Sequence, residues 1–363
     1  MRILAVAGAS GGHIFPAVGF LDDFKAVYPD ARTLLILPAR AIDKGFDTGG
    51  HPVRAISVAN VSMKASLRNI RACFNFIRSF FESIVILARF KPDIVVGFGS
   101  ISSIPVLTCA WLLRTTVMIH EQNVLPGRAN RFLAFISDRI AVSFQESAEY
   151  FSAHRANVVW TGNPVRKSLV AVDKISALGH FGLSAGKFTI LVMGGSQASR
   201  NINYGFARAF LALRSGGSLQ VIHLCGTADQ EGLQKEYSSC WDSVRLVAFL
   251  KNMEYAYSAA DLVISRAGAT TIAELMKYRL PAVLIPYPHA YAHQDQNARV
   301  LALAGCANIV TDAELAGGAL NNILQAVARE GSALEGMRRS FERFSSGTPL
   351  SLVDEAVKIH SHD

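Results

Sequence analysis

The chain has 363 residues, of which 50% are apolar and 18% are charged, and its mean hydropathy is +0.27. This composition indicates large buried cores and excludes a mostly disordered chain. The length suits two domains of ordinary size. The five cysteines are scattered without the spacing of a metal site, which predicts buried thiols in a reducing compartment and no bound metal.

The net charge of +8 is concentrated in the first part of the chain, where residues 1–165 hold 17 basic and 11 acidic side chains. This excess predicts an acidic partner. The sequence has no recognisable nucleic-acid motif, so we expect no nucleic acid. Two arginines and a glutamate interrupt the longest apolar run, 74–90, which argues against a membrane-spanning helix. The short apolar run at residues 1–8 predicts a first strand, not a signal peptide.

Short apolar runs alternate with helical patterns, and the pattern appears once in each half of the chain. Such an alternation predicts parallel strands joined by helices. The predicted strands are Ile3–Ala7, Thr33–Leu37, Ile94–Gly97, Val117–His120, Arg139–Val142, Val158–Thr161, Phe188–Met193, Gln220–Cys225, Arg245–Ala248, Leu262–Ser265, Val283–Pro286 and Ala307–Val310. We therefore expect two doubly wound α/β domains, with ligands beyond the carboxyl ends of the strands.

The junction between the halves starts at Gly162, where polarity rises and the periodicity weakens. We expect an N-terminal domain over residues 1–165 and a C-terminal domain over 166–345. The segment 346–363 is expected to pack back on the N-terminal domain. Each domain opens with a strand and a glycine-rich turn, at Gly8–His13 and at Gly194–Ser199. Two Rossmann-like domains whose turns face a common cleft are the predicted architecture.

The first glycine-rich turn ends in His13, at the predicted start of a helix. A histidine there could act as a base near neutral pH. A histidine that only caps the turn is an equally open alternative. The turn does not match G-x-G-x-x-G, which disfavours a nicotinamide-dependent dehydrogenase. The chain also lacks G-x-x-x-x-G-K-[ST], which argues against a P-loop ATPase.

Two further polar clusters follow predicted strands, at Phe98–Ser103 and at His120–Asn123. Parallel strands end at one edge of a sheet, so these clusters would line the same site as the first turn. Taken alone, each cluster is more often an ordinary loop whose polar residues cap the next helix. Three such loops in one domain favour a site.

Residues 64–91 form a phenylalanine-rich helical stretch in which Arg68, Arg71 and Arg78 lie close to one face. Apolar side chains rimmed by basic ones suit an anionic bilayer surface. A core helix of the domain is the alternative reading. We expect a mixture, with one face packed on the sheet and the exposed part in contact with a membrane.

The most informative stretch of the second half is 265–297. A small-residue turn follows the strand Leu262–Ser265 and opens a helix that carries Glu274, and a polar loop at His289–Asn297 follows the next strand. Backbone N–H groups at a helix N-terminus favour a diphosphate. A carboxylate about one and a half turns further on could reach a ribose diol. A strand–turn–helix packing unit without a ligand is the alternative.

Taken together, these motifs resemble those of the MurG family, the UDP-N-acetylglucosamine:lipid I N-acetylglucosaminyltransferases of bacterial peptidoglycan synthesis. The resemblance covers nearly the whole chain. It rests on Gly11–Ala17, His120–Asn123, Gly162–Arg166, Gly194–Gln197, Ser265–Gly268, Ala273–Leu275, His293–Gln294 and Asn297–Ala298. Several motifs in this order are more specific than any one of them.

The resemblance implies a GT-B fold with the UDP-sugar in the C-terminal domain and the lipid-linked acceptor in the N-terminal domain. It implies an inverting transfer without a metal or other cofactor, at the cytoplasmic face of the cell membrane. His13 matches the candidate base, which would take the proton from the C4 hydroxyl of the acceptor's muramic acid. Glu274 would hold the ribose, Leu250 would lie against uracil, and Gln294 would bind the amino sugar.

The same resemblance gives two sets of binding residues. Those matched to UDP-N-acetylglucosamine are Ser10, Gly11, Gly12, Asn123, Arg166, Ser196, Leu250, Ala269, Thr270, Thr271, Glu274 and Gln294. Those on the acceptor side are Gly99, Ser100, Ser103 and Glu121.

Three loops depart from the family's usual pattern. The first reads Gly-Ala-Ser at 8–10 instead of Gly-Gly-Thr, and the second reads Gly-Ser-Ile at 99–101 instead of Gly-Gly-Tyr. The third reads Ser-Gln-Ala-Ser at 196–199 instead of Ser-Gln-Gly-Ala. Other readings are a glycosyltransferase that acts on diacylglycerol or another lipid and a UDP-sugar-binding or scaffold protein without catalysis. An NAD-dependent dehydrogenase fits least.

Overall fold

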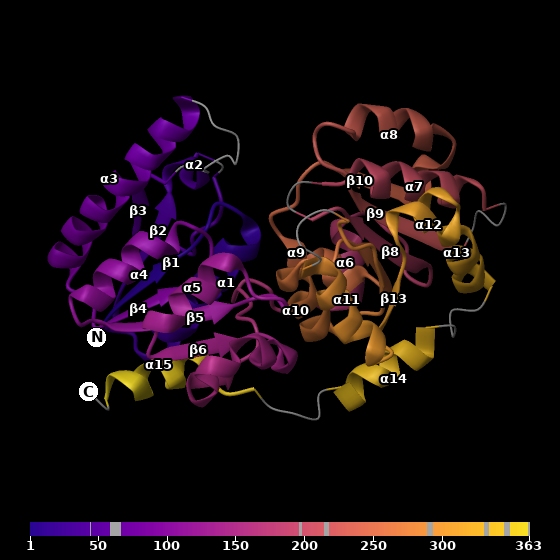
Figure 1. Ribbon diagram of the computed structural model, residues 1–363. Helices are drawn as coiled ribbons and strands as arrows, with labels where there is room; N and C mark the ends of the chain where they lie inside the picture. Colours follow the sequence, from indigo (N-terminus) through magenta and orange to yellow (C-terminus); the bar gives the residue numbers. More distant parts are fainter. Residues whose placement is uncertain are drawn as a thin grey trace. The chain divides into compact units, whose positions relative to one another are not determined.

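The computed structural model describes residues 1–363 except 44, 59–66, 196–197, 214–217, 289–292, 330–333, 345–348 and 362–363, and the side chains of 67–73 and 155–156. The chain forms two compact units, which we call unit 1 (Met1–Lys167 and Pro349–Asp363) and unit 2 (Ser168–Thr348). Figure 1 shows each unit as a sheet flanked by helices. All strand pairs in both sheets are parallel, so the predicted class of two Rossmann-like parallel-sheet domains is confirmed.

Unit 1 contains a seven-stranded sheet in the order β3-β2-β1-β4-β5-β6-β7. The strands are β1 (Arg2–Val6), β2 (Arg32–Pro38), β3 (Val53–Ile56), β4 (Ile94–Gly97), β5 (Thr116–Glu121), β6 (Arg139–Val142) and β7 (Val158–Trp160). Six of them were predicted from their continuous apolar runs, and all but the half-buried edge strand β7 are largely buried, as is usual in a parallel sheet. The edge strand β3 was missed, since it has only four residues and Arg54 interrupts its apolar run.

The helices of unit 1 cover both faces of this sheet. They are α1 (Gly11–Val27), α2 (Ala39–Ile42), α3 (Leu67–Phe90), α4 (Ser103–Leu112), α5 (Arg128–Leu133), η1 (Ala134–Ile136), η2 (Gln145–Asn157) and α15 (Leu352–His360). No helix of the described residues is long and apolar enough to cross a bilayer.

Unit 2 repeats the plan with a six-stranded sheet in the order β10-β9-β8-β11-β12-β13. The strands are β8 (Phe188–Met193), β9 (Leu219–Leu224), β10 (Val244–Val247), β11 (Leu262–Ser265), β12 (Ala282–Leu284) and β13 (Ala307–Ile309). The helices are α6 (Lys174–His180), α7 (Arg200–Leu211), α8 (Gln230–Glu236), η3 (Tyr237–Ser243), α9 (Met253–Ala259), α10 (Ala269–Tyr278), α11 (His293–Leu303), α12 (Asp312–Ala316), α13 (Ala319–Arg329) and α14 (Glu335–Phe344).

The strand order reverses between β1 and β4 in unit 1 and between β8 and β11 in unit 2. At such a point the loops that leave neighbouring strands turn toward opposite faces of the sheet, which opens a crevice at the strands' carboxyl ends. The loops after β1, β4, β8 and β11 carry four of the predicted motifs, and two others, His120–Asn123 and 289–297, lie at the end of β5 and after β12.

The C-terminal helix α15 is an integral part of unit 1, and it appears in Figure 1 as the yellow helix among the magenta elements. Val353 and Ala356 are buried in the core that also contains Phe20 and Phe24 of α1. Just before α15, the backbone N–H of Leu350 donates a hydrogen bond of 2.9 Å to the carbonyl oxygen of Trp160 and so ties the chain to the end of β7.

We expect Ala356→Asp to lower the free energy of unfolding of unit 1 by about 3 kcal/mol or more, because Ala356 has no exposed surface and the carboxylate would be buried without a partner. Lys358→Asp places the same side chain at an exposed position of the same helix, and although it removes the 3.7 Å ion pair of Lys358 with Glu355 it is expected to cost clearly less than Ala356→Asp. Urea unfolding of the full chain measures both. Equal effects would contradict the docking of α15 in the core.

Candidate functional site

His13 lies at the switch point of the first sheet, in the first turn of α1, the helix that follows β1. Glycines flank its ring on two sides. A Cβ atom at Gly8 would lie 2.8 Å from His13 Cδ2, and one at Gly99 would lie 3.3 Å from His13 Nδ1. A side chain at Gly8 would displace the imidazole and one at Gly99 would crowd it, so the absence of side chains at both positions leaves room for the ring.

Serine hydroxyls hold the loop after β4 in place. Ser102 Oγ donates a hydrogen bond of 3.1 Å to the carbonyl oxygen of Ala7, and Ser103 Oγ donates one of 2.6 Å to that of Gly99. Gly99 and Ser100 both have positive φ, 77° and 72°. Ser103, predicted on the acceptor side, thus has its hydroxyl engaged within the loop.

Glu121 lies beneath the loop that follows β5 and is buried. Its Oε1 accepts hydrogen bonds from the backbone N (2.9 Å) and the side chain (3.2 Å) of Asn123. Its Oε2 accepts from Gly127 N at 3.0 Å and from Asn130 Nδ2 at 2.8 Å. The carboxylate therefore shapes the loop that presents Asn123, and its predicted place on the acceptor side stays a prediction.

A chain of polar contacts connects His13 to the interior of unit 1. Its Nδ1 lies 3.2 Å from Gln122 Oε1, and Gln122 Nε2 lies 3.1 Å from His120 Nδ1. His120 Nε2 lies 2.9 Å from the carbonyl oxygen of Gly162. His120 is completely buried, and this burial lowers its pKa to about 4. It is therefore a neutral imidazole near pH 7.

Arg166 lies against the first turns of α1. Its guanidinium stacks 4.0 Å from the centroid of the Phe15 ring, an arrangement typical of a cation–π contact. The backbone of the same segment crosses α1 at Gly19, where an added Cβ would lie 3.1 Å from the carbonyl carbon of Val165. Arg166 and His13 are therefore held by the same end of the same helix.

In unit 2 the helix α10 begins directly after the turn at Gly268, so that Ala269, Thr270 and Thr271 form its first turn. The first N–H groups of a helix lack intrahelical acceptors and carry partial positive charge. The turn is anchored from α11 by Asn297, whose Nδ2 donates a hydrogen bond of 3.2 Å to the carbonyl oxygen of Ala267. This helix start can therefore bind an anion at a fixed position.

Glu274 lies one and a half turns into α10 and is largely buried. Tyr257 on α9 donates a hydrogen bond of 2.6 Å from its Oη to Glu274 Oε2. The same hydroxyl lies 3.8 Å from Met193 Sδ at the end of β8. The Tyr257 hydroxyl therefore orients the Glu274 carboxylate.

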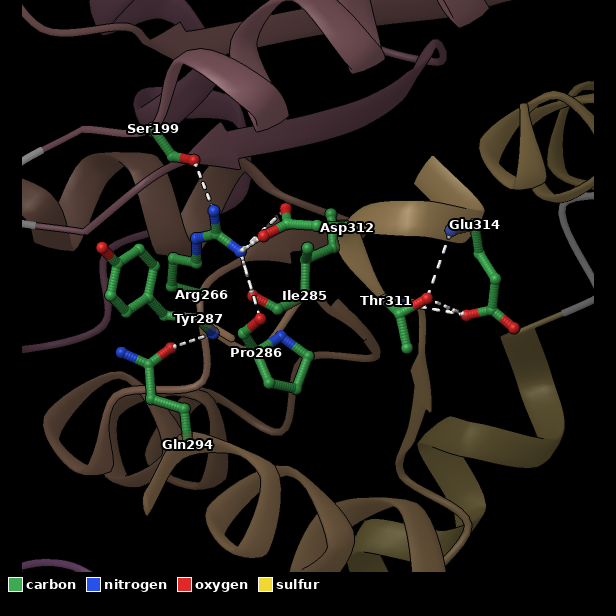
Figure 2. A network of polar contacts seen from close by, with 9 residues as sticks. All are labelled: Ser199, Arg266, Ile285, Pro286, Tyr287, Gln294, Thr311, Asp312 and Glu314. Carbon is green, nitrogen blue, oxygen red and sulfur yellow. Dashed lines mark hydrogen bonds and ion pairs between the residues drawn. The ribbon is translucent and has the colours of Figure 1, made fainter. Parts of the chain in front are cut away.

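Arg266 is the centre of the polar network drawn in Figure 2. One of its terminal nitrogens contacts both carboxylate oxygens of Asp312, at 3.1 and 3.2 Å, and donates to the carbonyl oxygens of Ile285 and Pro286. The other donates to Ser199 Oγ at 2.9 Å. One buried guanidinium therefore connects the loop after β8, the end of β12 and the start of α12.

Gln294 stands in the first turn of α11, beside this network (Figure 2). Its Oε1 accepts a hydrogen bond of 2.9 Å from the backbone N–H of Tyr287. The ring of Tyr287 lies 5.4 Å from the guanidinium carbon of Arg266. Arg266 thus orders the segment that orients the Gln294 amide.

The predicted site residues form one group in each unit. Around the switch point of unit 1 lie Ser10, Gly11, Gly12, His13, Gly99, Ser100, Ser103, Glu121, Asn123 and Arg166. At the carboxyl end of the second sheet lie Leu250, Ala269, Thr270, Thr271, Glu274 and Gln294. Ser196 lies outside the described residues. Within the described part of the chain, no cluster of three or more histidine, cysteine, aspartate or glutamate side chains could hold a metal ion.

Sequence reasoning gave no role to His120, Gln122, Tyr257 or Arg266. Three of them stand inside motifs that were recognised, so their position in the sequence was a usable signal. Tyr257 had none, because it precedes its partner by 17 residues and lies on another helix. A groove of about 1700 Å³ also lies in unit 1, between α1, β3 and α3, but none of the predicted site residues lines it.

Ala198→Gly is expected to raise the free energy of unfolding of unit 2 by about 0.5–1 kcal/mol, because Ala198 has a φ of 57° that an L side chain disfavours. Ala326→Gly, at an exposed interior position of α13, is the control and is expected to lower it by about 1 kcal/mol. Denaturant unfolding measures both. A lower free energy of unfolding in Ala198→Gly would contradict the expectation that the backbone of Ala198 is strained.

The two sheets correspond to two known domain families. Residues 3–142 match the glycosyltransferase family 28 N-terminal domain, and residues 189–348 match the glycosyltransferase family 28 C-terminal domain. In structure the chain is similar to MurG of Acinetobacter baumannii, with a TM-score of 0.73, 22% identity and coverage of 100% of this chain and 99% of the other. That similarity supports the predicted GT-B fold.

Curated relatives match almost from end to end. The chain is 36% identical to the UDP-N-acetylglucosamine--N-acetylmuramyl-(pentapeptide) pyrophosphoryl-undecaprenol N-acetylglucosamine transferase of Halothermothrix orenii, covering 99% of this chain and 100% of the relative. It is 33% identical to the enzyme of the same name from Desulforamulus reducens, covering 99% and 98%. The chain therefore belongs to the MurG family of N-acetylglucosaminyltransferases.

Proposed function

We propose that the protein transfers N-acetylglucosamine from UDP-N-acetylglucosamine to the C4 hydroxyl of the muramic acid in lipid I and so forms lipid II. The observation that carries this proposal is the end-to-end relationship to curated transferases of that activity, at 36% identity. The arrangement of polar groups at the switch points of both sheets supports it, because this is where open α/β sheets bind ligands.

Unit 2 is proposed to hold the nucleotide sugar. The first turn of α10, with the loop of Ser196, would bind the diphosphate through backbone N–H groups and the helix dipole. Glu274 would accept hydrogen bonds from the ribose hydroxyls, Leu250 would pack on uracil, and Gln294 would bind hydroxyls of the amino sugar. The contact from Tyr257 supports the role of Glu274, because it fixes one carboxylate oxygen beforehand.

Unit 1 is proposed to hold lipid I near His13. His13 would act as the general base for the C4 hydroxyl, and attack from the face opposite UDP would invert the α-linked donor to a β-glycoside. Gly99, Ser100, Ser103 and Glu121 belong to the loops of the acceptor side. Residues Ser10, Gly11, Gly12, Asn123 and Arg166 would face the donor. Helix dipole and backbone donors would stabilise the leaving diphosphate.

The proposal includes a peripheral position at the cytoplasmic face of the cell membrane, in contact through the stretch 64–91. Within α3, Phe74, Ile77 and Phe81 are exposed, whereas Ser79 and Ser83 on the opposite face are buried. A surface helix of a water-soluble domain has the reverse pattern. An exposed apolar face of this kind marks an interaction site.

Neighbouring groups favour a bilayer as the partner. Trp111 and Leu112, at the end of the adjacent helix α4, are also exposed. Arg54 and Arg89 are exposed along the groove beside α3. Aromatic and aliphatic side chains with arginines at their margin suit the boundary between headgroups and acyl chains of an anionic leaflet. The side chains of Arg68 and Arg71 lie outside the described residues.

The transfer is tested with UDP-N-acetylglucosamine, labelled in the sugar, and a lipid I analogue. We expect labelled lipid product and equimolar UDP, and a loss of kcat of about 100-fold or more in His13→Ala, because a positioned base contributes that much. A diacylglycerol acceptor serves as the control and is expected to give no product. Product on diacylglycerol alone would contradict lipid I as the acceptor. Unchanged turnover in His13→Ala would contradict the assignment of His13 as the general base.

The membrane contact is tested by sedimentation with vesicles that contain phosphatidylglycerol. We expect Ile77→Asp to weaken binding about tenfold or more, since burial of one aliphatic side chain contributes about 1.5–3 kcal/mol. Ile175→Asp is the matched control, because Ile175 is similarly exposed but lies in unit 2. Equal effects of the two substitutions would rule out α3 as the contact.

A further inference from the structure

Gln122 lies between two histidines that are far apart in the sequence. It follows β5 directly and is almost completely buried, and it reaches His13 on α1 with its Oε1 and His120 on β5 with its Nε2. The chain of contacts ends at the carbonyl group of Gly162, which follows β7. All of these groups belong to unit 1.

The direction of each hydrogen bond follows from the buried end of this chain. A backbone carbonyl oxygen can only accept, so His120 Nε2, 2.9 Å from the Gly162 oxygen, must carry the hydrogen and donate it. Burial keeps the His120 pKa at about 4, so near pH 7 the ring has one N–H and its Nδ1 is a bare acceptor. This acceptor faces Gln122.

The amide of Gln122 is oriented by two acceptors at once. Its Nε2 lies 3.1 Å from His120 Nδ1 and 2.9 Å from the carbonyl oxygen of His120, and neither atom can donate. The NH₂ group must therefore point to His120, which turns Oε1 toward His13. An amide oxygen only accepts, so Nδ1 of His13 is the donor of the 3.2 Å contact.

We propose that Gln122 and His120 are positioning residues that hold neutral His13 as its Nδ1–H tautomer, so that Nε2 is the atom that removes the acceptor's proton. The proposal rests on the proposed function of His13 as the base. As the acceptor O–H bond breaks, its proton passes to Nε2 and the oxygen bonds to C1 of the sugar. The bond from C1 to the diphosphate oxygen breaks, and its electron pair leaves with UDP.

An amide is well suited to this task. After the proton transfer the imidazolium still has its Nδ1–H, and Gln122 Oε1 can accept it in both protonation states of His13. Gln122 in turn is kept from rotating, because a rotated amide would place its oxygen against two acceptors of His120. The orientation of the base is therefore set by groups that do not themselves change charge.

The tautomer can be measured without any substrate. Full-length protein labelled with nitrogen-15 in histidine is studied by long-range proton–nitrogen correlation at pH 8, and the His13 signals are assigned by their loss in His13→Ala. We expect the Nδ1–H tautomer in the wild type and a substantial Nε2–H population in Gln122→Met. A wild-type Nε2–H tautomer, or the same tautomer in Gln122→Met, would overturn the proposal.

A kinetic comparison separates positioning from packing. We expect Gln122→Met to lower kcat at least about tenfold while the KM for UDP-N-acetylglucosamine changes less than about twofold, because only orientation of the base is lost. The loss of kcat is expected to accompany the change in the His13 tautomer, because both follow from the lost contact to Nδ1. A fall in kcat with the His13 tautomer unchanged, or a KM that rises as much as kcat falls, would indicate a packing role and contradict positioning.

The two proposals fail in different ways. If no sugar transfer to lipid I occurs, the proposed function falls, while the tautomer measurement still reports whether Gln122 orients His13. If transfer occurs and requires His13 but the tautomer is Nε2–H, the assignment of His13 as the base is supported. The proposed positioning role of Gln122 and His120 is then contradicted. The wild-type spectrum decides this even if a variant does not fold.

Discussion

The order of the parallel strands is the constraint on which the rest of the structure depends. In both units the second strand along the chain pairs with one side of the first, and a later strand pairs with the other side, so the sheet grows away from β1 and from β8 in two directions. The loops at these points diverge, and backbone from neighbouring loops can approach a ligand or a side chain closely. Gly8 and Gly99 lie in such loops, and their backbone comes close to the His13 ring on two sides.

The polar groups near the switch points differ between the two units. In unit 1 the side chains that contact His13 directly and through Gln122 are neutral, an amide and a buried imidazole, and they form one directed series of hydrogen bonds. In unit 2 the buried charge of Arg266 is paired with Asp312 and saturated by carbonyl oxygens. A buried cation without such partners would be costly. The pairing lets one buried cation join three loops of unit 2.

The sequence was sufficient to predict the core strands, because each of them is an apolar run bounded by polar loops. It was also sufficient to predict the turns at their carboxyl ends. It could not show β3, a four-residue strand whose apolar run is interrupted by Arg54. It also could not assign Gln122, since its contact to His13 joins residues 109 apart and exists only because α1 lies beside the end of β5. The carboxylate of Glu274 was recognisable from its helix position, but its partner Tyr257 required the tertiary fold.

The backbone conformation explains how two of the three loops tolerate their departure from the family pattern. Ser100 and Ala198 replace residues that are usually glycine, and both keep the positive φ that glycine adopts freely. The left-handed conformation is therefore imposed by the surrounding loop and not by the residue that occupies it. In the loop of Ser100 the hydroxyls of Ser102 and Ser103 donate hydrogen bonds to carbonyl oxygens, and in the loop of Ala198 the Ser199 hydroxyl accepts a hydrogen bond from Arg266. Contacts of this kind can hold a locally unfavourable backbone when they over-determine it, which explains how both switch-point loops keep their shape without the usual glycine.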